Sequence, residues 1–146
     1  MSKIKNPTNS RNILITGGAG FIGANLVKYF LDKEGYDITL FDNLSAETES
    51  NLNRAIRDSE QKSKINFIKG DILDYSSLNK AIKGHSEAIH LAAHTRVTKS
   101  LKNPKENFEV NSIGAFNVIE VARKNRIKKF IFASSNATAG EQIPPI

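Results

Sequence analysis

The chain has 146 residues, of which 39% are hydrophobic and 25% charged, and its formal net charge is +6 at pH 7. This composition is typical of one soluble globular domain and excludes a fibrous or low-complexity protein. With no cysteine, a disulfide framework and a thiolate metal site are excluded. The polar N-terminus, residues 1–11, has no apolar segment long enough for a signal peptide or a membrane span. We therefore expect a cytoplasmic protein with no membrane partner and no metal.

The predicted elements alternate between short β-branched apolar runs and helical patterns. We expect residues 1–10 to be flexible and residues 11–146 to form one domain. The predicted strands are 12–16, 37–41, 65–69, 88–92 and 128–133. The predicted helices are 21–31, with Ile22, Leu26 and Phe30 on its apolar face, then 47–61, 76–82, and one from Pro104 to about Lys124. A long connection without predicted structure precedes Pro104.

Strands that alternate with helices predict right-handed crossovers. The fold class is therefore α/β, a doubly wound parallel sheet of about five strands in the order 3-2-1-4-5 with helices on both faces. The basic residues are dispersed, and their densest group, at 123–129, follows a predicted helix, where cations complement the helix dipole. No aromatic-interleaved basic stripe accompanies them. A solvated surface explains the charge, so no nucleic-acid partner is expected.

Three glycines lie where the first strand meets the first helix. Gly17 permits the tight turn, Gly20 lets the backbone approach a pyrophosphate, and Gly23 lets the helix pack on the sheet. The start of the helix offers unpaired N–H groups and a partial positive charge to phosphates. Such glycines can also be purely structural. Their position between a strand and a helix favours a dinucleotide-binding site of the Rossmann type.

An acidic residue, Asp42, follows the second strand, nineteen positions after Gly23. Its carboxylate can accept hydrogen bonds from both hydroxyls of the adenosine ribose and would repel a 2′-phosphate, and Asn43 rather than an arginine follows it. These features favour NAD over NADP, although Asp42 could also only cap the loop. Asp71, after the third strand, could accept from the adenine amino group or simply form a Gly-Asp turn.

The motifs together resemble the N-terminal part of an extended short-chain dehydrogenase/reductase of the NAD-dependent epimerase/dehydratase group, which acts on nucleotide sugars; the UDP-glucose 4-epimerases are the most similar members. The resemblance covers about residues 11–146. It rests on residues 16–23, 42–45, 70–72, 90–93, Asn111 with Gly114, and Ser134 with Ser135.

The resemblance implies a set of NAD-binding residues besides the three glycines: Phe21 and Ile22 at the pyrophosphate; Asp42, Asn43 and Ser45 at the adenosine ribose; Asp71 and Ile72 at the adenine; Ala92, Ala93 and Thr95 at the nicotinamide-side ribose; and Asn111 at the junction of cofactor and substrate. It also implies that Ser135, with Ser134 as the alternative, is the catalytic residue that hydrogen-bonds the reacting sugar hydroxyl. Small residues such as Ala92 and Ala93 would equally suit any strand end beneath a helix.

The departures from the family pattern are also informative. The Tyr-x-x-x-Lys motif that follows the serine strand in the family is absent, and Tyr29 with Lys33 has the spacing but lies in the first helix. Ala139 replaces the usual aromatic residue before Gly140. The family's substrate domain and sixth strand are absent too. We therefore expect the chain alone to be catalytically incomplete.

Three functions remain open from the sequence. The first is the NAD-binding portion of a nucleotide-sugar epimerase or dehydratase, and the second is a stand-alone NAD-binding or subunit-interaction module. The third is an inactive folding remnant. A reading frame that supplies Tyr-x-x-x-Lys would favour the enzyme. The resemblance also implies a homodimer, because helices beside the fourth and fifth strands often form the dimer face in this superfamily. The helix opened by Pro104 carries apolar residues that must be shared between core and interface: Phe108, Val110, Phe116, Val118, Ile119 and Val121.

Overall fold

The computed structural model describes residues 10–33, 35–45, 49–57 and 65–141. Most of the segment expected to be flexible lies outside these residues. The elements in chain order are β1 (Arg11–Thr16), α1 (Phe21–Leu31), β2 (Tyr36–Asp42), α2 (Glu49–Ile56), β3 (Ile65–Lys69), α3 (Tyr75–Ala81), β4 (Glu87–His90), α4 (Val97–Lys102), α5 (Pro104–Phe108), η2 (Glu109–Gly114), α6 (Ala115–Lys124), β5 (Lys129–Phe132) and η3 (Asn136–Ala139). In the described part of the chain, no helix has the length and apolar character to cross a membrane.

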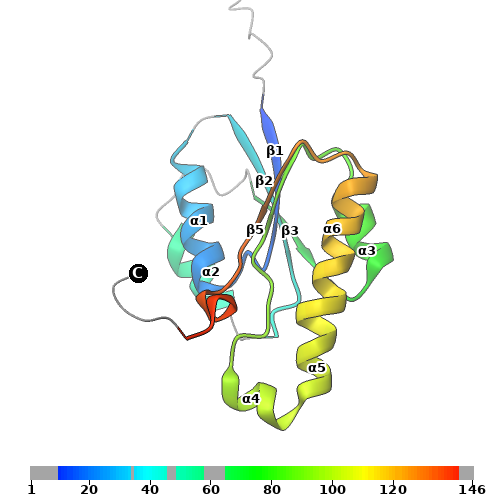
Figure 1. Cartoon of the computed structure of the whole chain (residues 1–146). Coiled ribbons are helices and arrows are strands. Elements are labelled where there is room, and N and C mark those ends of the chain that lie inside the picture. The colour runs from blue at the N-terminus through cyan, green and yellow to red at the C-terminus, as the bar shows by residue number, and fades with distance from the viewer. Residues whose placement is uncertain (1–9, 34, 46–48, 58–64, 142–146) are drawn as a thin grey trace, which may run out of the picture.

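The five strands form one sheet in the order β3-β2-β1-β4-β5, and every pair is parallel. This confirms the predicted α/β fold class and strand order. Helices α1 and α2 lie on one side of the sheet, and α3 and α6 lie on the other (Figure 1). Each parallel connection crosses over through a helix, as short β-branched strands between amphipathic helices require.

The central strands are buried on both faces, which explains their continuous apolar runs. Along β1, Ile13 and Ile15 contribute to the apolar cluster beneath α1, while Leu14 contributes to the cluster beneath α3 and α6. All three side chains are at most 1% exposed. Because successive side chains of the strand point to opposite faces, β1 contributes to two apolar cores, one on each face of the sheet.

The edge strand β5 differs from the central strands. Ile131 pairs with Ile89 of β4, yet Ile131 is 46% exposed whereas Ile89 is 5% exposed. Phe132, the next residue, is also 46% exposed. Within the described residues, Ile131 and Phe132 belong to neither apolar cluster. The two faces of β5 therefore present apolar surface at the edge of the sheet.

The range predicted for the first helix is confirmed, and of its predicted apolar face Leu26 and Phe30 pack against the core whereas Ile22 does not. Ile22 is 66% exposed, and Leu26 and Phe30 are only partly buried. The residues that α1 buries are Gly23, Ala24, Val27 and Leu31. The close packing of Gly23 on the turn at Gly17 rotates the helix so that these positions meet the sheet.

The connection before Pro104 contains a helix that the sequence did not predict. This helix, α4, buries none of its residues, and its Val97 and Leu101 are 73% and 78% exposed.

Three other elements of the structure also differ from the sequence prediction. The strand predicted over 88–92 ends at His90, so 91–93 is a loop. Of the helix predicted over 47–61, the structure describes a helix over Glu49–Ile56. The η3 turn after β5 was not predicted either.

The helix opened by Pro104 is confirmed and is interrupted by a π-helical turn. Asn103 caps it by accepting a hydrogen bond from the Glu106 backbone N–H, and Pro104 occupies its first turn. The chain keeps helical dihedral angles from α5 through η2 into α6. A π-turn adds a residue to the helix, and such turns are frequent at functional sites. Here the turn lies beside the loops that follow β3 and β4.

The basic group at the end of α6 interacts on the helix surface. Arg123 donates two hydrogen bonds of 2.8 Å to Glu120, and Lys124 Nζ lies 3.5 Å from the same carboxylate. The Arg123 hydrogen bonds lower the pKa of Glu120 to about 2. These pairs fit the solvated surface that we expect for the positive charge, and the absence of a nucleic-acid partner stays a prediction.

Candidate dinucleotide-binding site

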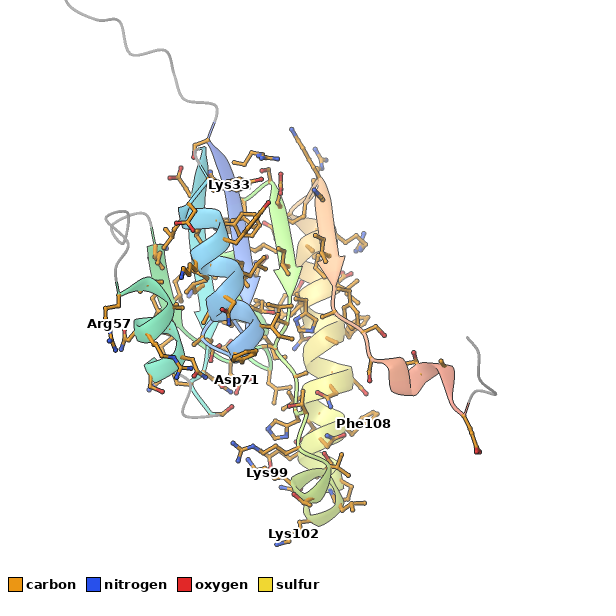
Figure 2. All side chains as sticks on the ribbon, turned by 90° about the vertical axis from the view of Figure 1, so that its left-hand side faces the viewer. Lys33, Arg57, Asp71, Lys99, Lys102 and Phe108 are labelled. Carbon is orange, nitrogen blue, oxygen red and sulfur yellow. The ribbon has the colours of Figure 1, made fainter. Side chains whose placement is uncertain are left out.

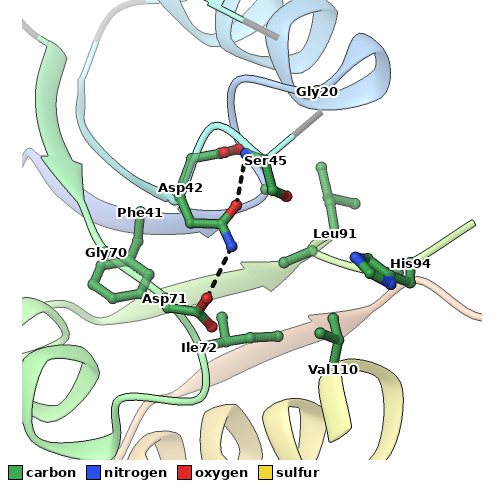
Figure 3. Close-up of a pocket in the computed structure, with 14 residues that line it drawn as sticks. Gly20, Phe41, Asp42, Ser45, Gly70, Asp71, Ile72, Leu91, His94 and Val110 are labelled. Carbon is green, nitrogen blue, oxygen red and sulfur yellow. Dashed lines mark hydrogen bonds between the residues drawn. The ribbon is translucent and has the colours of Figure 1, made fainter. Parts of the chain in front are cut away.

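A pocket lies at the carboxyl ends of the strands, where β1 sits between β2 and β4 and the strand order reverses (Figure 3). In doubly wound sheets this crevice is the usual ligand site. Nine of the predicted residues line it: Gly17, Gly20, Asp42, Asn43, Ser45, Asp71, Ile72, Ala92 and Ala93. Five further lining residues were not predicted: Phe41, Gly70, Leu91, His94 and Val110.

The turn at Gly17 shows why this loop is built from glycine. Gly17 has φ of +72°, and a Cβ there would lie 2.6 Å from the Ala92 backbone nitrogen. A Cβ at Gly23 would lie 2.5 Å from the Gly17 carbonyl oxygen. The first contact brings the β4 loop against the turn, and the second brings α1 against it. Both predicted structural roles, the tight turn and the close helix packing, are confirmed.

The amino end of α1 lies at the pocket. Gly20 lines the pocket, and its N–H donates to the Gly17 carbonyl over 3.1 Å. The first helical bond runs from the Ala24 N–H to the Gly20 carbonyl, and no side chain caps the helix. The positive end of the helix dipole therefore points to this region. Phe21 and Ile22 do not line the pocket, so their backbone contacts to a pyrophosphate stay a prediction.

Asp42 ties two pocket loops together. Its Oδ2 accepts the Ala19 N–H over 3.0 Å, and its Oδ1 accepts the Leu44 N–H over 2.8 Å. The second bond holds Leu44 at φ of +59°, a left-handed conformation that is rare for a bulky residue. Asp42 thus has the loop-capping role considered from sequence, and the same carboxylate lines the pocket where a ribose would lie.

Asn43 joins the loops after β2 and β3. Its Nδ2 donates to Asp71 Oδ2 over 2.9 Å, and its Oδ1 accepts the Ser45 N–H over 3.0 Å; Figure 3 draws both bonds. The other oxygen of Asp71 accepts the Leu73 N–H over 2.9 Å. Asp71 therefore forms the turn considered from sequence. Its contact with an adenine amino group stays a prediction.

Asn111 does not line the pocket but holds the loop that does. Its Oδ1 accepts the His94 N–H over 2.8 Å, and its Nδ2 donates to the His94 carbonyl over 3.0 Å. One side-chain amide thus satisfies both backbone groups of His94. Thr95, the next residue, is exposed and lies outside the pocket lining. Its predicted contact with the nicotinamide-side ribose stays a prediction.

The candidate catalytic serines follow β5 and do not line the pocket. Ala133 N–H donates to the His90 carbonyl over 3.1 Å, which places the ends of β5 and β4 side by side. The Ser135 carbonyl accepts the Thr138 N–H and hydroxyl, so η3 begins directly after this serine. Ser134 and Ser135 thus lie at the carboxyl ends of the strands, as the pocket does. Their catalytic role stays a prediction.

A buried polar pair beside the pocket was missed by sequence reasoning. Thr16 Oγ1 lies 2.6 Å from His90 Nδ1, and the two residues are 1% and 3% exposed. Burial lowers the pKa of His90 to about 4, so the ring is neutral at pH 7. His90 ends β4 and directly precedes Leu91 in the pocket. The only sequence signal was a histidine that closes an apolar strand.

The described part of the chain contains no group of three or more acidic, histidine or cysteine residues able to hold a metal ion.

The chain matches the family model for GDP-mannose 4,6 dehydratase over residues 14–144. The chain therefore belongs to the GDP-mannose 4,6 dehydratase family. This result confirms the resemblance to the N-terminal portion of the NAD-dependent epimerases and dehydratases.

Relatives and solved structures extend this assignment. A putative UDP-glucose 4-epimerase of Methanocaldococcus jannaschii is 37% identical over 132 residues, which cover 88% of the chain and 40% of the relative. The UDP-glucose 4-epimerase of Brucella ovis in complex with NAD is 31% identical with a TM-score of 0.79, over 94% of the chain and 40% of that structure.

The UDP-N-acetylglucosamine 4-epimerase of Methanobrevibacter ruminantium, in complex with UDP-N-acetylmuramic acid, is also similar. It is 33% identical with a TM-score of 0.79, over 93% of the chain and 41% of that structure. The chain thus spans about two fifths of the length of the proteins it matches.

Proposed function

We propose that this chain is the NAD-binding portion of a nucleotide-sugar epimerase or dehydratase. The observation that carries the proposal is the pocket in which Gly17, Gly20 and Asp42 meet at the carboxyl edge of the sheet. The family assignment and the similar epimerase of Brucella ovis, which binds NAD, support it.

The residues of the pocket fit a dinucleotide. A Cβ at Gly17 would collide with backbone, so the turn keeps its close approach only with glycine, and the uncapped end of α1 favours phosphate nearby. Asp42 offers a carboxylate to ribose hydroxyls and disfavours a 2′-phosphate. The cavity of about 110 Å³ is smaller than the roughly 300–1,000 Å³ of whole-ligand pockets. The cavity therefore encloses only part of the dinucleotide.

When bound, NAD would accept a hydride from the carbon that bears a sugar hydroxyl and later return it. In this chain Asn43 and Ser45 would support the adenosine ribose, Ala92 and Ala93 the second ribose, and Ser135 or Ser134 would hold the sugar hydroxyl. No Tyr-x-x-x-Lys follows the serines in the 146 residues. General acid–base catalysis contributes about 10²–10⁴-fold. The chain alone would therefore turn over little substrate, and a stand-alone NAD-binding module is the alternative.

Thermal unfolding with NAD or NADP tests the proposal. A ligand at about 100 times its dissociation constant stabilises the native state by about 2.7 kcal/mol, which raises Tm by roughly 5–11 °C. We expect this rise with NAD and little change with NADP. The Asp42→Asn variant should lose part of this preference because it removes the negative charge. A wild-type chain whose Tm responds to neither nucleotide would contradict the proposal.

An exposed apolar row on the helix of α5, η2 and α6 supports a homodimer. Phe108, Ile113, Phe116 and Ile119 are between 45% and 62% exposed, and Phe108 projects outward in Figure 2. Val118 and Val121 are instead buried against the sheet, so the helix divides its apolar residues between core and surface. Contiguous apolar surface of this kind marks association sites. We infer that a second copy of the chain covers this row.

Sedimentation velocity tests the homodimer. We expect a dimer for the wild type and a monomer for Phe116→Glu, because a buried charge at the centre of the row would lack a partner. Tyr29→Glu is the matched control, since Tyr29 is an aromatic residue 56% exposed on α1, away from the row. It should remain dimeric. A wild type that sediments as a monomer at all concentrations would exclude this interface.

A further inference from the structure

Asn117 of α6 makes hydrogen bonds with the loop that follows β3. Its Nδ2 lies 3.0 Å from the Ile72 carbonyl oxygen and 3.5 Å from the Leu73 carbonyl oxygen. The residue is half-buried and does not line the pocket. Asp71 and Ile72, which this loop carries, do line it. Asn117 therefore holds a loop of the pocket from outside the pocket lining.

The same loop is held at other points, so its position is well determined. Asp71 is bonded to Asn43 on one side and to the Leu73 N–H on the other. The Ile72 side chain occupies the space next to Gly114, where a Cβ would lie 2.5 Å from Ile72 Cδ1. Of these supports, the Asn117 bond anchors the backbone of Ile72 to the helix. A freed carbonyl would be left without this donor in a part-buried place.

The helix thus carries two side-chain amides that hold two pocket loops. Asn111 holds His94 after β4, and Asn117 holds Ile72 after β3. The π-turn η2 covers Glu109–Gly114 and includes Asn111, while Asn117 lies in α6 just after it. The turn therefore sets the helix phase at which each amide meets its loop. The two amides therefore tie two loops that line the pocket to the same helix.

We propose that Asn117 is a positioning residue for the adenine side of the NAD site. This inference rests on the proposed function. Asn117 holds the Ile72 backbone in place before the ligand arrives, so that binding does not have to order the loop. Its removal should weaken binding of the adenosine half even in a chain that remains folded.

AMP is the probe, because it carries the adenosine half alone. We expect Asn117→Leu, which keeps the side-chain size but cannot donate, to raise the Kd of AMP by about 5- to 30-fold, the range expected when a hydrogen-bonded support is lost. The titration is followed by NMR at a temperature well below the Tm of each variant. Asn117→Ala repeats the test if the leucine variant does not fold.

Asn125→Leu is the matched control. Asn125 also ends α6 with a side-chain amide that bridges elements, donating to Asn79 Oδ1 and the Val121 carbonyl over 2.8 Å each, but it touches no pocket loop. Its replacement should lower Tm while the Kd of AMP stays at the wild-type value. A merely structural role for Asn117 predicts this same behaviour for its own variants.

Hydrogen exchange of the Leu73 N–H in the free chain gives a second readout. That N–H is bonded to Asp71 within the loop, so its exchange should quicken in the Asn117 variants and not in Asn125→Leu. Wild-type AMP binding with an unchanged Kd in Asn117→Leu and Asn117→Ala would overturn this inference alone. A wild type that binds neither AMP nor NAD would overturn it together with the proposed function.

Discussion

Gly17→Ala is expected to lower the free energy of unfolding by about 2–5 kcal/mol and to abolish nucleotide binding. The backbone at Gly17 has φ of +72°, which costs a residue with a Cβ about 1–2 kcal/mol. The added methyl would lie 2.6 Å from the Ala92 nitrogen and 2.8 Å from its Cα. These are backbone atoms that cannot rotate away, and overpacking of this kind costs about 1–3 kcal/mol more. Denaturant unfolding measures the loss.

Gly84→Ala separates the two contributions. Gly84 has φ of +80°, but a Cβ there has no neighbour within 4 Å. This variant should lose only the conformational part, about 1–2 kcal/mol, and should keep the NAD-induced rise in Tm. If Gly17→Ala proved no less stable than Gly84→Ala, the close contact between the glycine turn and the β4 loop would not exist in solution.

The sheet is well predicted from the sequence because each strand is specified by neighbouring residues in the chain. Short continuous apolar runs such as 13–15 between turn signals indicate buried strands, and glycines at a strand–helix turn favour a dinucleotide-binding turn. Asp42 is equally predictable, because its place at the end of β2 follows from the strand itself. The five strands are of this kind, and so are Gly17, Gly20, Asp42 and Asp71 of the pocket. The family resemblance, and not a local pattern, implied the other predicted lining residues: Asn43, Ser45, Ile72, Ala92 and Ala93.

The missed features depend on contacts between distant segments. Asn111 meets His94, and Gly114 meets Ile72, only after the helix has packed on the sheet, so no local pattern announces η2. The helix α4 buries no residue, and so it lacks the apolar periodicity by which helices are recognised. Ile22 was misplaced because its spacing suits an apolar face, whereas the glycine turn decides how α1 sits.

Lowering the pH from 7 to 5 is expected to reduce the free energy of unfolding by about 2 kcal/mol through His90 alone. Burial lowers the pKa of folded His90 from its ordinary value of 6.5 to about 4. The unfolded chain therefore binds more protons than the folded one between these two values. Stability is retained above pH 6.5 and falls as the pH drops toward 4. Urea unfolding at a series of pH values measures this slope.

His90→Asn identifies the source of the slope, because asparagine can still hydrogen-bond Thr16 and does not titrate. This variant should be less stable at pH 7, since it leaves space beside Phe132, whose ring centroid lies 5.2 Å from that of His90. Between pH 7 and 5, however, it should lose about 2 kcal/mol less than the wild type. His85→Asn, which removes a half-buried histidine from the opposite end of the sheet, is the matched control for the loss of a histidine. Equal slopes in the wild type and His90→Asn would mean that the ring accepts a proton in the folded chain as readily as in the unfolded one, and that water reaches the Thr16–His90 pair beside the pocket.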